Sequence, residues 1–119
     1  MAIILQSRVL PILFRDEHLV AIHKPSGLLV HRTSLDAHEP RFAVQLLRRQ
    51  LRRRVYPVHR LDKGASGALL FGLDPQVAAA LGETVRLHAL RRTYLAVVRG
   101  HTPEEGEIDH PLARRFDPA

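Results

Sequence analysis

Residues 59–67 read His59-Arg60-Leu61-Asp62-Lys63-Gly64-Ala65-Ser66-Gly67, and the apolar segment 68–71 follows directly. This stretch places one carboxylate between an arginine and a lysine, at the head of a turn that contains glycine. A carboxylate with a cation beside it stays ionised, which is the state that a nucleophile or a general base requires. Because the stretch lies outside any repeating apolar pattern, Asp62 is predicted to belong to a site rather than to a solvated helix face.

Arg60 is the expected partner of Asp62. Residues i and i+2 of an extended segment project to the same side, and Pro57 favours extended backbone just before this pair. Two simpler interpretations remain open. Asp62 is also the kind of residue that caps a turn before a glycine, and an ordinary surface ion pair contributes only about 0–1 kcal/mol.

The composition is that of a water-soluble globular domain. The chain has 119 residues, of which 45% are hydrophobic and 25% charged, so one domain or less is expected. No apolar run is long enough to span a membrane. The absence of cysteine excludes disulfides and thiolate chemistry, and it suits a reducing cytoplasm, where we expect the protein. The eight histidines are scattered without helical spacing, so no metal site is expected.

The positive charge is concentrated in one short segment. The net charge is +6, and between residues 48 and 54 the chain contains an arginine cluster without any acidic residue: Arg48, Arg49, Arg52, Arg53 and Arg54. Such a patch favours a polyanion, of which RNA and DNA are the commonest. A solvated helix face that only aids solubility is the alternative.

The apolar periodicity predicts an α/β (α+β) fold with a mixed, mainly antiparallel sheet and flanking helices. Strands are expected over residues 11–14, 19–22 and 94–98, a turn over 24–27 and a loop over 32–40. One helix is expected from 41 to 55, ended by Pro57. A second is expected from Asp74-Pro75, an N-cap followed by a proline in the first turn, to about residue 90.

The segment His59-Arg60-Leu61-Asp62, followed by Ser66-Gly67, resembles the catalytic motif of the RluA-type pseudouridine synthases. Three further segments resemble that family in the right order, namely residues 16–31, 92–100 and 108–112. Four motifs in order are specific, whereas any one alone would be weak. Two positions depart from the family pattern: Ala65 stands where threonine is usual, and Arg92 where lysine is usual.

The resemblance implies an enzyme that isomerises a uridine of structured RNA, with tRNA as the expected substrate, and that needs no cofactor, metal or ATP. The implied catalytic residues are Asp62, Arg60 and Tyr94. Asp62 would attack the target nucleoside, Arg60 would lie near the RNA left vacant by the flipped base, and Tyr94 would lie near the base. By itself, Tyr94 is an ordinary apolar strand position. The residues expected to contact RNA are Arg48, Arg49, Arg52, Arg53, Arg54, Lys63 and Arg92.

Members of this family are longer, and their later part carries a Thr-Gly-Arg-x-His-Gln-x-Arg segment that this chain lacks. Residues 1–119 are therefore expected to be the N-terminal part of a single catalytic domain, inactive on its own. A non-catalytic RNA-binding remnant is one alternative. An enzyme that uses paired carboxylates, as glycoside hydrolases do, is another, but the nearest acid to Asp62 is Asp74, which has the sequence context of a helix cap.

Overall fold

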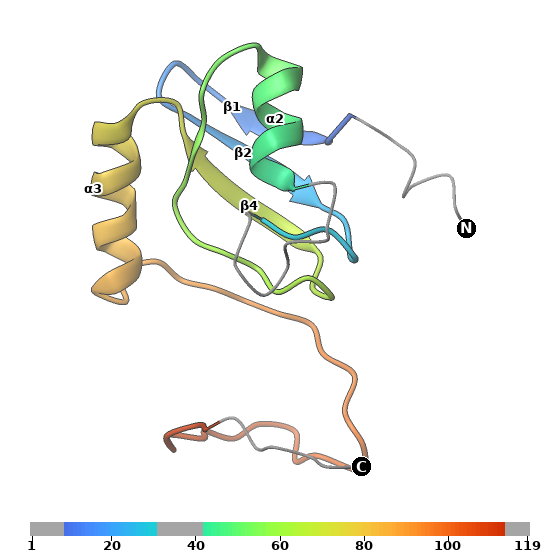
Figure 1. Ribbon diagram of the computed structural model, residues 1–119. Helices are drawn as coiled ribbons and strands as arrows, with labels where there is room; N and C mark the ends of the chain where they lie inside the picture. Colours follow the sequence, from blue (N-terminus) through green and yellow to red (C-terminus); the bar gives the residue numbers. More distant parts are fainter. Residues whose placement is uncertain (1–8, 31–41, 114–119) are drawn as a thin grey trace.

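The computed structural model describes residues 9–30 and 42–113, and its ordered part is one sheet with two helices (Figure 1). The sheet has four strands in the order β1-β2-β4-β3. The strands are β1 (Ile12–Arg15), β2 (Leu19–Lys24), β3 (Tyr56–Pro57) and β4 (Gly67–Gly72). All three pairings are antiparallel, which confirms the predicted α+β class. The predicted loop over 32–40 lies outside the described residues.

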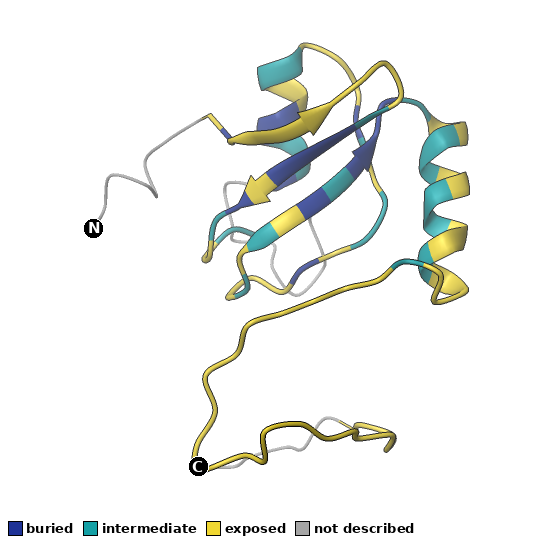
Figure 2. Cartoon of the chain, turned by 180° about the vertical axis from the view of Figure 1, so that it is seen from behind, coloured by how far each residue is buried: buried dark blue, intermediate teal, exposed yellow. Residues whose placement is uncertain are grey.

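The core lies between β2, β4 and helix α2 (Ala43–Leu51). Val20, Ile22, Leu69 and Phe71 are completely buried at the centre of the sheet, which is dark blue in Figure 2. Helix α2 contributes Ala43, Leu46 and Leu47 to the same cluster. Burial of such aliphatic side chains is the main force that holds the sheet and α2 together.

Helix α2 ends earlier than the sequence predicts. Its last residue is Leu51, and Arg52 adopts a left-handed conformation (φ 57°) that caps the helix. The predicted extension to residue 55 is wrong. Val55 packs in the core, and the chain leaves the helix before this residue and enters β3 directly after it. Pro57 therefore lies within β3, paired with Phe71, and does not end the helix.

Helix α3 (Pro75–Arg86) begins as predicted. The Asp74 carboxylate accepts the Val77 N–H at 2.9 Å, and Pro75 opens the first turn. The helix ends at Arg86 rather than near residue 90, followed by His88 in a left-handed conformation. Helix α3 contains no buried residue and packs beside β4 and β3.

The strand predicted over residues 94–98 is not formed. This segment belongs to an extended, exposed part of the chain after α3, and the Leu95 and Val97 side chains are fully exposed (Figure 2). A strand needs a neighbour to pair its backbone N–H and C=O groups. Within the described residues no strand pairs with this segment, so its apolar, β-branched composition alone does not make it a strand.

No helix in the described part of the chain is long and apolar enough to cross a membrane. In residues 9–30 and 42–113 no three histidine, aspartate or glutamate side chains come together as metal ligands.

Candidate active site and nucleic-acid interface

The loop between β3 and β4 presents Asp62 at the surface. Leu61 is buried in the core and anchors the loop, whereas Arg60 and Asp62 on either side of it are exposed. The Ala65 N–H donates to the Asp62 carbonyl oxygen at 3.0 Å, which closes a turn after the acid. Asp62 is thus the first residue of a turn that the buried side chain of Leu61 attaches to the core.

The turn after β2 holds this loop from the side. The Gly27 N–H donates to the Lys63 carbonyl at 2.7 Å, and the Ser26 hydroxyl donates to the Gly64 carbonyl at 2.8 Å. Gly27 has φ 91°, a conformation that favours glycine. Two motifs that are far apart in sequence, residues 24–27 and 62–66, therefore form one structural unit.

The expected ion pair between Arg60 and Asp62 is not formed. Among the described residues no salt bridge joins the two side chains, although both are exposed. The prediction treated residues 60–62 as an extended segment, where i and i+2 project to the same side. They lie instead in irregular chain that leads into a turn, so the alternation of a strand does not bring the two groups into contact.

His59 has a structural position that the sequence did not reveal. The Leu70 N–H donates to the Nε2 atom of His59 at 3.2 Å. The Nδ1 atom of His59 is buried and has no hydrogen-bond partner among the described residues. Burial lowers the pKa of His59, the Arg60 backbone opposes this shift, and the positive charge of Arg92 adds to it. The ring is therefore neutral at pH 7 and completes the pairing of β4 where β3 ends.

The lowered pKa of His59 predicts a loss of stability in mild acid. Between that lowered value and the ordinary value of about 6.5, the unfolded chain binds more protons than the folded one, so stability falls as the pH falls through this window. In His59→Gln, which does not titrate, we expect a smaller decline of the urea midpoint from neutral pH to about pH 5. His101→Gln, at an exposed position, serves as the control. Equal declines in all three proteins would refute this role for His59.

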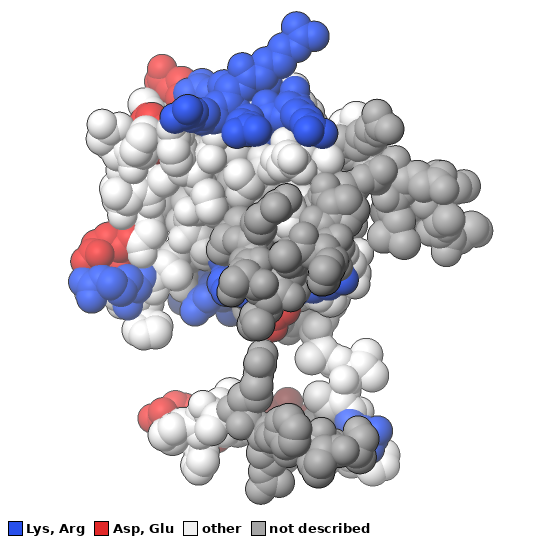
Figure 3. Space-filling view, in the orientation of Figure 1, with Lys and Arg blue, Asp and Glu red and all other residues white. Residues whose placement is uncertain are grey.

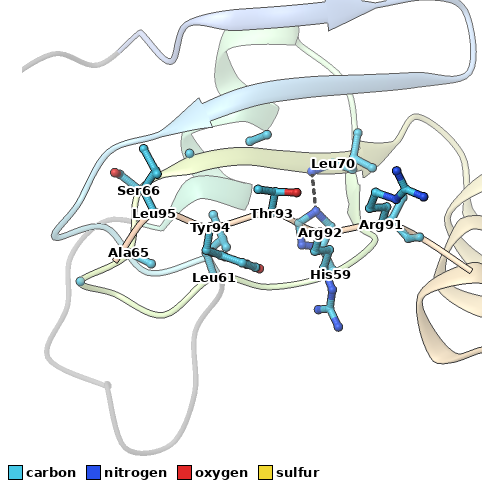
Figure 4. Close-up of a pocket in the computed structure, with 14 residues that line it drawn as sticks. His59, Leu61, Ala65, Ser66, Leu70, Arg91, Arg92, Thr93, Tyr94 and Leu95 are labelled. Atoms are coloured by element: carbon cyan, nitrogen blue, oxygen red, sulfur yellow. Dashed lines mark hydrogen bonds between the residues drawn. The ribbon is translucent and has the colours of Figure 1, made fainter. Parts of the chain in front are cut away.

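A cavity of about 680 Å³ lies between the Asp62 loop, β4 and the segment 90–95 (Figure 4). Its lining includes His59, Leu61, Ser66, Leu70, Arg92 and Tyr94. The structure thus brings Tyr94 and Arg92 to the loop that carries Asp62, as the sequence motifs imply. Asp62 and Arg60 flank Leu61 but do not line the cavity themselves.

The arginine cluster (Arg48, Arg49, Arg52, Arg53 and Arg54) lies at the other end of the sheet. All five side chains are exposed, and they form the basic surface at the top of Figure 3, at the C-terminal end of α2. Cations at this end also interact favourably with the helix dipole. Arg53 also forms a hydrogen bond within the fold, because its Nη2 donates to the Leu73 carbonyl at 2.6 Å.

The separation of the two regions follows from the register of the sheet. Lys24 pairs with Gly67 beside the Asp62 loop, whereas Tyr56, just after the arginine cluster, pairs with Gly72. The two ends of β4 are about 17 Å apart at the usual rise of a strand. Lys63 follows Asp62 in the chain and Arg92 lines the cavity beside the Asp62 loop, whereas the arginine cluster lies at the other end of β4.

The fold is that of pseudouridine synthase domains. The structure of Human RNA Pseudouridylate Synthase Domain Containing 4 superposes with a TM-score of 0.53 and 28% identity, over 66% of this chain and 30% of that chain. Human RNA Pseudouridylate Synthase Domain Containing 1 gives the same TM-score at 21% identity, over 67% of this chain and 29% of the other. The latter likeness concerns the fold alone.

The sequence comparisons agree with the fold. The family model described as RNA pseudouridylate synthase matches residues 18–118. The tRNA pseudouridine synthase C of Haemophilus ducreyi is 50% identical over 103 residues, which are 87% of this chain and 42% of that protein. The Vibrio cholerae protein of the same name is 44% identical over 92% of this chain and 45% of its own length. The chain belongs to the RNA pseudouridylate synthase family, and it spans less than half the length of these curated relatives.

Proposed function

We propose that the protein converts a uridine of structured RNA, and specifically of tRNA, into pseudouridine, with Asp62 as the nucleophile. The observation that carries the proposal is the exposed Asp62 carboxylate on a loop that the turn 24–27 clamps, next to a cavity lined by Tyr94. The names of the relatives support tRNA as the substrate. A cytoplasmic location is part of the proposal.

The chemistry needs a carboxylate and no cofactor. The N1–C1′ glycosidic bond breaks, the uracil turns, and C5 bonds to C1′ in place of N1. C5 releases its proton to solvent and N1 gains one, so the product is an isomer of the substrate. A carboxylate suits this reaction because it is both a nucleophile and a leaving group. Attack at the ribose C1′ and attack at the uracil C6 both satisfy this balance.

We assign Arg60 and Tyr94 to the flipped nucleotide. An enzyme that works on a base in a duplex must first extrude the base from the stack. Arg60 is exposed beside Asp62 and would contact the RNA at the position that the base has left. Tyr94 is 58% exposed and would stack near the base. The cavity that Tyr94 lines supports this assignment.

The two basic regions would contact the RNA at separate points. Lys63 and Arg92 lie near Asp62 and would contact phosphates close to the target. The arginine cluster, about 17 Å away along β4 at the usual strand rise, would contact phosphates further along the molecule. The two basic regions would therefore contact different phosphates of the same RNA.

Removing charge from the arginine cluster should weaken tRNA binding and reduce its salt dependence. In a variant with Arg48→Gln, Arg49→Gln and Arg52→Gln, each lost phosphate contact should lower the log–log salt slope by roughly 0.7–0.9. Arg53 is kept because it bonds to the Leu73 carbonyl. Arg86→Gln is the control, since that arginine is already paired with Glu83. An unchanged slope in the triple variant would mean that the cluster faces away from the RNA.

The proposed activity is tested by mapping pseudouridine in an unmodified tRNA after incubation with this chain continued into a complete catalytic domain. We expect product at a defined uridine. Binding without product would contradict the proposed activity. The Asp74 carboxylate, the acid that the paired-carboxylate alternative would use, caps α3, which weighs against that alternative.

A further inference from the structure

The pairing between β3 and β4 ends in an irregular way at Leu70. The register of the two strands, which ends with Pro57 opposite Phe71, places Val58 opposite Leu70. Residues that form a hydrogen-bonded antiparallel pair exchange two backbone bonds. The Val58 N–H does donate to the Leu70 carbonyl at 3.1 Å, but the Leu70 N–H donates at 3.2 Å to the Nε2 atom of His59 and not to the Val58 carbonyl.

The imidazole of His59 therefore takes the place of one backbone carbonyl of the sheet. A regular second bond would hold Val58 against β4 and continue β3 towards residue 60. With the ring as the acceptor, the Leu70 N–H keeps a partner while the main chain after Val58 leaves the sheet. The chain is irregular from residue 59 onwards, Leu61 enters the core, and Asp62 begins the turn three residues after the ring.

This hydrogen bond forms in one protonation state of the ring only. A neutral imidazole has one N–H and one acceptor nitrogen, whereas a protonated imidazole has two N–H groups and no acceptor. Because Nε2 of His59 accepts, the proton of the neutral ring lies on Nδ1, which is buried and without a hydrogen-bond partner among the described residues. Protonation of Nε2 would place two N–H groups, its own and that of Leu70, against each other and break the bond.

The surroundings of the ring keep it neutral near pH 7. Burial lowers the pKa of His59, the positive charge of Arg92 adds to this shift, and the backbone of Arg60 opposes it. The strand to which the ring is bonded, β4, has no charged residue. On the ring's own loop, the charged side chains of Arg60, Asp62 and Lys63 are exposed.

We propose that His59 is a positioning residue that fixes the point at which the Asp62 loop leaves the sheet, and that protonation of its ring releases this point. Its effect on turnover rests on the proposed function, whereas its effect on the loop does not. Without an acceptor on residue 59, the Leu70 N–H would be left unpaired, or Val58 would close the regular pair and carry residues 60–62 along β4. Either change would displace Asp62.

The first test uses the chain without any substitution, so it does not depend on the folding of a variant. In a uniformly ¹⁵N-labelled sample near pH 7, the Nε2 atom of His59 should have the chemical shift of an unprotonated nitrogen and a scalar coupling to the Leu70 amide nitrogen across the hydrogen bond. On acidification, the Leu70 amide shift should change with the same midpoint as the His59 ring, below the ordinary value of about 6.5. A proton on Nε2 at neutral pH, or a Leu70 amide that titrates independently of the ring, would overturn the proposal.

The second test changes the acceptor. In His59→Leu, which has no acceptor, the amides of Leu70 and Ala65 should exchange about tenfold faster, while the amide of Ile22 in the sheet changes much less. In His59→Gln, whose side-chain carbonyl can replace Nε2, both rates should stay near those of the parent. His101→Leu, at an exposed position, is the control. Unchanged amides in His59→Leu, or equal acceleration throughout the sheet, would refute a local positioning role.

Turnover is measured in a complete catalytic domain. His59→Leu should lower kcat by about tenfold or more with little change in KM for tRNA, because the nucleophile is displaced while the basic surface is intact. His59→Gln should recover most of this loss and, since glutamine does not titrate, should lose less kcat than the parent as the pH falls below about 6.5.

A change in KM alone in His59→Leu, or the same acid loss of kcat in the parent and in His59→Gln, would contradict the proposal. If the parent domain makes no pseudouridine, the proposed function fails, while the measurements on the Leu70 amide still decide the role of His59.

Discussion

Asp62→Asn is expected to abolish pseudouridine formation in a complete catalytic domain, with a loss of about 10³-fold or more in single-turnover rate. The carboxamide keeps the shape of the side chain but is not a nucleophile. Binding of tRNA should be retained, since the change removes a negative charge near the phosphates and no positive one. The loop should also keep its conformation, because Asp62 uses its backbone carbonyl, and not its side chain, in the turn with Ala65.

Asp74→Asn is the matched control for this substitution. Asp74 caps α3 through its side chain, and asparagine is an equally good N-cap, so both fold and turnover should be preserved. A rate in Asp62→Asn within about tenfold of the parent would rule out Asp62 as the nucleophile. Loss of activity in both variants would point instead to a general sensitivity of the domain to lost acidic charge.

Gly72→Ala is expected to cause the largest loss of stability of any small substitution in the described chain. Gly72 is the last residue of β4, where α3 crosses close to the strand. A Cβ at this position would lie 2.7 Å from the backbone nitrogen of Ala78 and 2.8 Å from its Cβ. Because the obstacle is largely backbone, α3 must move, at a cost of about 1–3 kcal/mol or more.

The control for Gly72→Ala is Gly64→Ala. A Cβ at Gly64 meets no atom within 4 Å, and the position does not require a positive φ. Its urea midpoint should therefore match that of the parent, whereas that of Gly72→Ala should be clearly lower. Equal midpoints for the two variants would show that α3 does not pack against β4 as closely as described.

The features that were predicted correctly depend on short-range rules. The N-cap at Asp74 and the turn at residues 24–27 each follow from a few neighbouring residues, and both are found. The strands near residues 12–15 and 19–24 follow from local apolar runs. Tyr94 lines the cavity beside the Asp62 loop, and its role in the active site stays a prediction.

The features that were missed depend on the tertiary structure. Helix α2 ends at Leu51 because Val55 must enter the core, which the helical spacing of the sequence does not reveal. The segment 94–98 has the composition of a strand but pairs with no strand in the described residues. The Arg60–Asp62 ion pair is not formed, and the contact of Lys24 with the Asp62 loop, through the Lys63 carbonyl, depends on the fold and not on sequence spacing.

The most direct test of the proposed reaction uses tRNA with tritium at C5 of its uridines, incubated with the complete catalytic domain. Isomerisation replaces the C5–H bond by the C5–C1′ bond, so we predict release of one tritium for each pseudouridine formed, with no free uracil. Free uracil would indicate cleavage of the glycosidic bond, as in the paired-carboxylate alternative. Tight tRNA binding without tritium release would contradict the account.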